Sequence, residues 1–111
     1  FGNYLIQKLV ELLNKQELYE IVCNIEQKII FISKNAFGTR VLQKIISISN
    51  NTEINSKIVN QISKYDCLDL ILDNNASHVV SALINCVPIK DLTFLYKIFI
   101  DNTEIITRNK N

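Results

Sequence analysis

The stretch FGNYLIQKLV at residues 1–10 recurs as FGTRVLQKII at residues 37–46, an offset of 36 residues. Phe, Gly, Gln and Lys are identical in the two copies, and the four aliphatic positions stay aliphatic. A third copy, NASHVVSALI at residues 75–84, follows after a further 38 residues and keeps the aliphatic positions. Within each copy the apolar residues recur at the i, i+3, i+4 spacing of a helix. A helical repeat of about 36 residues is typical of an α-solenoid.

The segments between the copies also resemble one another. Each contains a polar break and then an amphipathic helix, at residues 18–25, 54–62 and 92–100. A short apolar helix follows at residues 29–32 and 68–72. Asn14 with Glu17 three residues later predicts a capping-box start for the first of these amphipathic helices. The sequence therefore predicts an all-α fold, an α-α superhelix of armadillo-like repeats over residues 1–111, with leading helices near 1–13, 36–48 and 75–86.

The composition is that of a globular chain, with 48% apolar and 21% charged residues. Two glycines and one proline are too few turn signals for a β-sandwich or barrel. The net charge of +1 neither supports nor excludes a nucleic-acid partner. There is no signal peptide and no apolar run long enough for a bilayer, so we expect no membrane partner. The chain starts at Phe1 within a helical pattern and has no polar terminal helix, so we interpret it as part of a longer protein with exposed apolar ends.

Residue patterns for catalysis are missing from the sequence. There is one histidine, no Ser/His/Asp or Cys/His arrangement, no phosphate-cradling glycine loop and no metal-ligand cluster. We therefore expect no enzymatic activity, no catalytic residues, no cofactor, no metal and no small-molecule substrate. Cys23, Cys67 and Cys86 are widely spaced and odd in number, so we expect them to be small buried hydrophobic residues.

The polar positions inside each copy are the candidate binding residues. They form triplets at i, i+1 and i+4, which are Asn3, Tyr4, Gln7; Thr39, Arg40, Gln43; and Ser77, His78, Ser81. On a helix i and i+4 share one face, so two polar side chains there can grip a planar group by its edge. The residue at i+1 is flat or π-capable in all three copies, and such groups stack on nucleobases. A single polar set of this kind is usually a solvated helix face, but its repetition in register favours recognition of unpaired bases.

The blocks FGNYLIQK and FGTRVLQK resemble the RNA-contacting helices of Pumilio-type (PUF) repeats, and the resemblance covers essentially the whole chain. It implies three helices per repeat, a crescent with RNA along its inner face, and one base read per repeat. The order of Tyr4, Arg40 and His78 is similar to the second to fourth repeats of an eight-repeat domain. By position, the residues implied to meet base edges are Asn3, Gln7, Thr39, Gln43, Ser77 and Ser81, and those implied to stack are Tyr4, Arg40 and His78. Lys8 and Lys44 follow the glutamines and are candidates for phosphate contact, or else solubilise the surface.

The resemblance also implies a base for each repeat. Asn3 and Gln7 form the family's uracil-reading pair, and Thr39 with Gln43 suits adenine, although the family usually has Cys or Ser in place of Thr39. Ser77 and Ser81 depart from the pattern because the family usually has an amide or a carboxylate where Ser81 stands. We therefore expect that repeat to tolerate most bases. With RNA antiparallel to the protein, the expected site is 5′-N-A-U-3′, within a longer UGUANAUA-type element.

Three functions follow as hypotheses. The first is sequence-specific binding of single-stranded messenger RNA in 3′ untranslated regions, in the cytoplasm, with recruitment of protein co-repressors. The second is a PUF-related nucleolar factor for ribosomal RNA with weak base preference, which Ser77 and Ser81 favour. The third is a protein-binding scaffold of HEAT or armadillo character, which has no reason to repeat the triplets in register. Acidic residues on or near the first intervening helix favour an acidic outer surface opposite a more basic inner one; these are Glu11, Glu17, Glu20 and Glu26.

Overall fold

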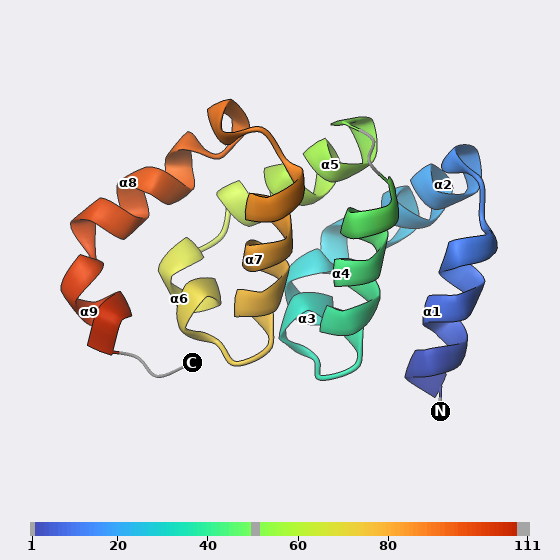
Figure 1. Cartoon of the computed structure of the whole chain (residues 1–111), viewed down its shortest axis with the longest axis horizontal. Helices are drawn as coiled ribbons and strands as arrows, with labels where there is room; N and C mark the ends of the chain where they lie inside the picture. Colours follow the sequence, from blue (N-terminus) through green and yellow to red (C-terminus); the bar gives the residue numbers. More distant parts are fainter. Residues whose placement is uncertain (1, 50–51, 109–111) are drawn as a thin grey trace.

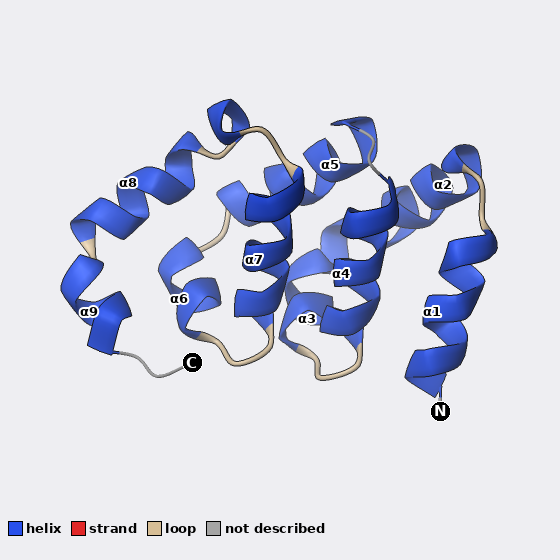
Figure 2. Cartoon of the chain, viewed as in Figure 1, coloured by secondary structure: helices blue, strands red, loops and turns tan. Residues whose placement is uncertain are grey.

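The computed structural model describes residues 2–49 and 52–108, apart from the side chains of residues 2, 3 and 52. All regular structure in these ranges is helical (Figure 2). The helices form three groups, each with two longer helices and one short one. The first group is α1 (Gly2–Leu12), α2 (Lys15–Ile25) and α3 (Ile29–Lys34); the second is α4 (Gly38–Ser49), α5 (Thr52–Ser63) and α6 (Cys67–Leu72); the third is α7 (Ala76–Cys86), α8 (Thr93–Asp101) and α9 (Thr103–Arg108). Two 3₁₀ turns, η1 (Glu26–Lys28) and η2 (Ile89–Asp91), connect neighbouring helices.

The leading helices of the three groups stand side by side in one row (Figure 1). Helix α4 lies in the middle of the row and packs against both α1 and α7. On the other side of the molecule α2 packs against α5. The predicted all-α solenoid is confirmed, and the helices expected near residues 1–13, 36–48 and 75–86 correspond to α1, α4 and α7. The three helices that carry the predicted binding triplets are therefore neighbours in the fold.

The core lies between this row and the helices behind it. Leu42, Ile45 and Ile46 of α4 are fully buried, as are Ile54, Ile58 and Ile62 of α5. Their spacing of three or four residues places them on one face of each helix. Burying an aliphatic side chain of this size contributes roughly 1.5–3 kcal/mol to stability. Burial of this apolar face therefore determines the orientation of α4 about its own axis and which of its residues remain at the surface.

Side-chain caps fix where the helices begin. Asn14 Oδ1 accepts from the Glu17 backbone N–H at 2.8 Å while the Glu17 carboxylate accepts from the Asn14 N–H at 2.9 Å, which confirms the predicted capping box. Before α4, Asn35 Oδ1 accepts from two backbone N–H groups, those of residues 37 and 38. Before α7, Asp73 Oδ1 does the same for residues 75 and 76. The same local device therefore starts two of the leading helices.

Gly38 allows α4 to start directly on the end of α3. A β-carbon at this position would lie 2.5 Å from the Ile32 carbonyl oxygen and 2.8 Å from Ile32 Cγ2. Both distances are shorter than any ordinary carbon contact, so only glycine fits without movement of the backbone. At the matching position of α7 stands Ala76, whose side chain is buried.

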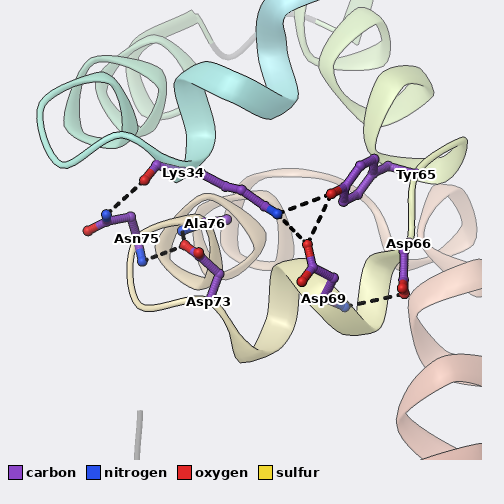
Figure 3. A network of polar contacts seen from close by, with 7 residues as sticks. All are labelled: Lys34, Tyr65, Asp66, Asp69, Asp73, Asn75 and Ala76. Atoms are coloured by element: carbon purple, nitrogen blue, oxygen red, sulfur yellow. Dashed lines mark hydrogen bonds and ion pairs between the residues drawn. The ribbon is translucent and has the colours of Figure 1, made fainter.

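A polar network joins the first two groups (Figure 3). The Lys34 ammonium at the end of α3 donates to the carboxylate of Asp69 on α6 and, at 3.1 Å, to the hydroxyl of Tyr65. Tyr65 donates to the same Asp69 oxygen at 3.1 Å. These hydrogen bonds, chiefly that from Lys34, lower the pKa of Asp69, and they raise the pKa of Lys34. The network therefore holds both ions in their charged forms at neutral pH.

Some expectations from the sequence differ from the structure. Cys67 is buried as expected, but Cys23 and Cys86 are exposed, because Cys23 is outside the buried stripe of α2 formed by Leu18 and Val22 and Cys86 is the last residue of α7. Helix α9 was not predicted. The expected apolar ends are present, with Leu5, Leu9 and Leu12 of α1 exposed and Ile89 and Ile105 exposed at the other end. Within the described ranges, no helix has the length and apolar character needed to cross a bilayer.

Candidate nucleic-acid interface

An open groove runs along the row of leading helices. Its volume is about 800 Å³, and α4 and α7 form most of its wall, with one residue from α1. Seven of the residues predicted for RNA contact line it, namely Gln7, Thr39, Arg40, Gln43, Lys44, His78 and Ser81. Three helices thus bring predicted base-edge, stacking and phosphate-contacting residues to one open surface.

Thr39 and Gln43 form a hydrogen-bonded pair on α4. The Gln43 Nε2 amide donates to Thr39 Oγ1 at 3.3 Å, and Thr39 Oγ1 donates to the backbone carbonyl of Asn75 at 2.7 Å. Thr39 is only 3% exposed, whereas Gln43 is half-buried in the groove. Asn75 precedes α7, and its own side chain donates to the Lys34 carbonyl at 2.8 Å. The side-chain pair of the second repeat is therefore tied to the backbone of the third.

The third triplet is divided between two surfaces. His78 and Ser81 line the large groove, but Ser77 does not. Ser77 lies instead in a smaller cavity of about 260 Å³ whose lining is mostly aliphatic and aromatic and includes Phe99 and Ile106. Ser81 also borders this cavity. Of the third triplet, the described structure therefore presents only the Ser81 hydroxyl and the His78 ring to the large groove.

The first triplet is only partly described. Gln7 is half-buried and lines the groove from α1. Tyr4 is exposed, and the Lys8 ammonium lies 5.7 Å from the centroid of its ring. The side chain of Asn3 lies outside the described residues, so its role as a base-edge contact stays a prediction. Arg40 and His78, the other predicted stacking residues, are both exposed beside the groove.

Glu11 lies between the two lysines predicted to contact phosphate. Its carboxylate is 2.6 Å from the ammonium of Lys44 and 3.7 Å from that of Lys8. The hydrogen bond and charge of Lys44, with a smaller effect of Lys8, lower the pKa of Glu11. The expectation that Glu11 belongs to an acidic outer surface was wrong, because Glu11 is on α1 and neutralises the inner lysines. Glu17 and Glu20 lie on α2, and Glu26 is in η1, where it pairs with Lys57 at 3.4 Å.

Several groove residues were not predicted from the sequence. They are Ala36, Ser47, Asn75, Ala82, Asn85 and Cys86. Ser47 and Asn85 stand eight residues after Thr39 and Ser77, and a helix returns to nearly the same face after seven or eight residues. Extending each triplet by one more turn would therefore have found these two. Among the described residues, no three His, Cys, Asp or Glu side chains gather where they could hold a metal ion.

Comparison with known proteins identifies the repeat. The family model described as "Pumilio-family RNA binding repeat" matches residues 1–26 and 28–63. Pumilio homolog 12 of Arabidopsis thaliana is 40% identical over 83 residues, which cover 72% of this chain and 14% of that protein. The chain spans less than a fifth of the length of this and other curated Pumilio relatives.

Solved structures agree with the sequence matches. The Puf4 RNA-binding domain, bound to the HO endonuclease RNA 3′ UTR recognition sequence, superposes with a TM-score of 0.84 at 29% identity and covers 93% of this chain. The yeast Puf5p RNA-binding domain bound to SMX2 RNA gives a TM-score of 0.81 at 30% identity and covers 96%. This chain corresponds to 32% and 31% of those two domains.

Proposed function

Because this chain belongs to the Pumilio (PUF) family of RNA-binding repeats, we propose that its groove binds single-stranded RNA in a sequence-specific way, with one base per repeat. The observation that carries the proposal is the shared register of the groove residues. Gln7, Gln43 and Ser81 occupy the same position of α1, α4 and α7, and all three line the groove. Such a row presents one edge-reading side chain to each successive base.

The chemistry of each position supports a base assignment. In the first repeat Gln7 with Asn3 offers amides to uracil, and Tyr4 stacks. In the second, Gln43 beside Thr39 offers an amide to adenine, and the Arg40 guanidinium stacks on the base while adding positive charge near phosphates. In the third, Ser81 offers one hydroxyl that can donate or accept, so His78 stacks on any base. The proposed site is 5′-N-A-U-3′.

The biological role that this activity supports is post-transcriptional regulation. The Puf4 domain bound to a 3′ UTR recognition sequence favours messenger RNA as the ligand. For a protein with this role we propose a cytoplasmic location and protein co-repressors as partners. A weakly selective factor for structured RNA is the second candidate, because Ser77 lies outside the groove and the third triplet offers only the Ser81 hydroxyl for contact with a base edge. The family match favours either RNA-binding role over a protein-binding scaffold.

Fluorescence anisotropy at one stated salt concentration tests the proposal. The full-length protein is titrated with a short RNA containing UGUANAUA and with versions changed singly at N, at the following A and at the next U. We expect changes at A and at U to weaken binding by about 1 kcal/mol or more each, and changes at N to have no effect. Equal binding of all the RNAs would establish the weakly selective role instead. If none of the RNAs binds even at low salt, the remaining hypothesis is a protein-binding scaffold.

A further inference from the structure

The hydroxyl of Thr39 has only one proton, and the structure shows where that proton goes. The Asn75 carbonyl can only accept, so in the 2.7 Å contact Thr39 Oγ1 must be the donor. The oxygen of Thr39 is then left as an acceptor. The amide atom of Gln43 that faces it at 3.3 Å must therefore be the nitrogen and not the oxygen. Hydrogen-bond chemistry alone therefore fixes the orientation of the Gln43 amide, although the NH₂ and C=O ends of an amide have nearly the same shape.

We propose that Thr39 is a positioning residue for base selection, which locks the amide of Gln43 in one orientation, and that this lock selects bases with an amino group over bases with a keto group at the second repeat. The inference rests on the proposed function, because it concerns how the same groove distinguishes bases. Thr39 itself is almost fully buried, so it acts through Gln43.

The selection follows from the order of donors and acceptors. One N–H of the amide is directed to Thr39, which leaves its second N–H and its carbonyl oxygen as a donor and acceptor pair. Adenine and cytosine present a ring nitrogen acceptor beside an amino donor, whereas uracil and guanine present a ring N–H donor beside a carbonyl acceptor. For a base held in one orientation, these two classes need opposite orders of donor and acceptor. A glutamine free to turn its amide over can satisfy both classes, and a locked glutamine satisfies one.

The lock is rigid because its parts are held independently. Threonine is branched at Cβ, so its side chain has few rotamers within a helix. The Asn75 backbone is fixed by its side chain on the Lys34 carbonyl at 2.8 Å and by its N–H on Asp73 at 2.8 Å. The Asn75 carbonyl also accepts from the His78 N–H at 3.1 Å, so it keeps a partner when the Thr39 hydroxyl is removed. A variant without the hydroxyl therefore retains the helix start and its packing.

The test compares Thr39→Val with Thr39→Ser. The valine variant keeps the shape and removes the hydroxyl, whereas the serine variant keeps the hydroxyl. Anisotropy is measured for the full-length protein with the UGUANAUA RNA carrying A, C, U or G at the position after N. We expect the wild type and Thr39→Ser to bind RNA with A or C more tightly than RNA with U or G. In Thr39→Val this ratio of affinities should fall about tenfold, which corresponds to the loss of one good bidentate contact. Thr93→Val, the same change on α8, should leave the preference unchanged.

Three results would overturn the inference. One is undiminished preference in Thr39→Val, and another is an equal loss of affinity for all four bases, which would make Thr39 structural only. The third is a wild type that binds RNAs with different bases equally well at every position. Only this third result would also refute the proposed sequence-specific function. If Thr39→Val melts well below the wild type, Thr39→Ala provides a second variant without the hydroxyl, and the same comparison of four bases decides.

Discussion

The carboxylate of Glu11 on α1 lies 2.6 Å from the ammonium of Lys44 on α4, so an acidic side chain of one repeat neutralises a basic side chain of the next. Lys8 lies 3.7 Å from the other oxygen of the same carboxylate. Both lysines are the ones expected to meet phosphate. An RNA that engages them must therefore compete with a protein anion already in place.

Replacing Glu11 by Gln should strengthen RNA binding severalfold and steepen its salt dependence. The change frees two ammonium groups, and each one that newly engages a phosphate adds nearly one to the slope of log affinity against log salt. The measurement is anisotropy at four salt concentrations, with Glu20→Gln on α2 as the control, because it removes the same charge away from the groove. A slope equal to that of the wild type would contradict the prediction that Glu11 keeps these lysines away from RNA phosphates.

Removing the ring of Tyr4 should weaken RNA binding by about 1–3 kcal/mol with little dependence on the base, because stacking uses the face that all bases share. Tyr4 and Tyr96 are both 62% exposed, so Tyr96→Ala on α8 is a matched control for the loss of an exposed ring. Anisotropy with U and with A opposite the first repeat separates stacking from edge reading. If Tyr4→Ala binds RNA as tightly as the wild type, Tyr4 does not stack on a base.

Replacing Gly38 by Ala should destabilise the protein by about 1–3 kcal/mol, the usual cost of forcing an extra carbon into a packed site. The new β-carbon would meet the Ile32 carbonyl oxygen at 2.5 Å, and a backbone atom cannot move aside as a flexible side chain can. Thermal or urea unfolding measures the change. Ser56→Ala, at an exposed position of α5, provides the control and should melt close to the wild type.

The Lys34–Asp69 ion pair should make stability depend on pH in the acid range. The pKa of Asp69 lies below its ordinary value of 3.8 in the folded chain, because Lys34 and then Tyr65 hydrogen-bond to the carboxylate. The contribution is therefore fully present above the unfolded pKa and is lost as the pH falls through the folded pKa. Asp69→Asn should melt below the wild type at neutral pH, and the two melting temperatures should converge on acidification. Asp101→Asn is the control, and a constant difference at all pH values would contradict the assignment.

The repeat pattern was enough to predict the helices of this fold apart from α9. Apolar spacing located the three leading helices and the amphipathic ones behind them, because burial of one face determines both the periodicity and the packing. The Asn14 and Glu17 capping box was also correct, since it depends only on residues three apart. Apolar spacing and capping pairs depend only on residues close in sequence, so a single sequence is enough to recognise them.

Relations between repeats could not be obtained in this way. Thr39 and Ser77 occupy the same register, yet one is tied to the start of the next leading helix and the other borders an apolar cavity. The pairing of Glu11 with Lys44 also depends on how two helices lie against each other. Helical spacing specifies which side chains share a face, but not what the neighbouring helix places opposite them.

The partner of the Thr39 hydroxyl is a peptide carbonyl, which every amino acid possesses. A mutation at position 75 can shift that carbonyl but cannot delete it, whereas a mutation at position 39 can delete the hydroxyl in a single step. Among descendants of this gene, gain or loss of the bond is therefore expected to track the residue at position 39 and to be largely indifferent to the residue at position 75.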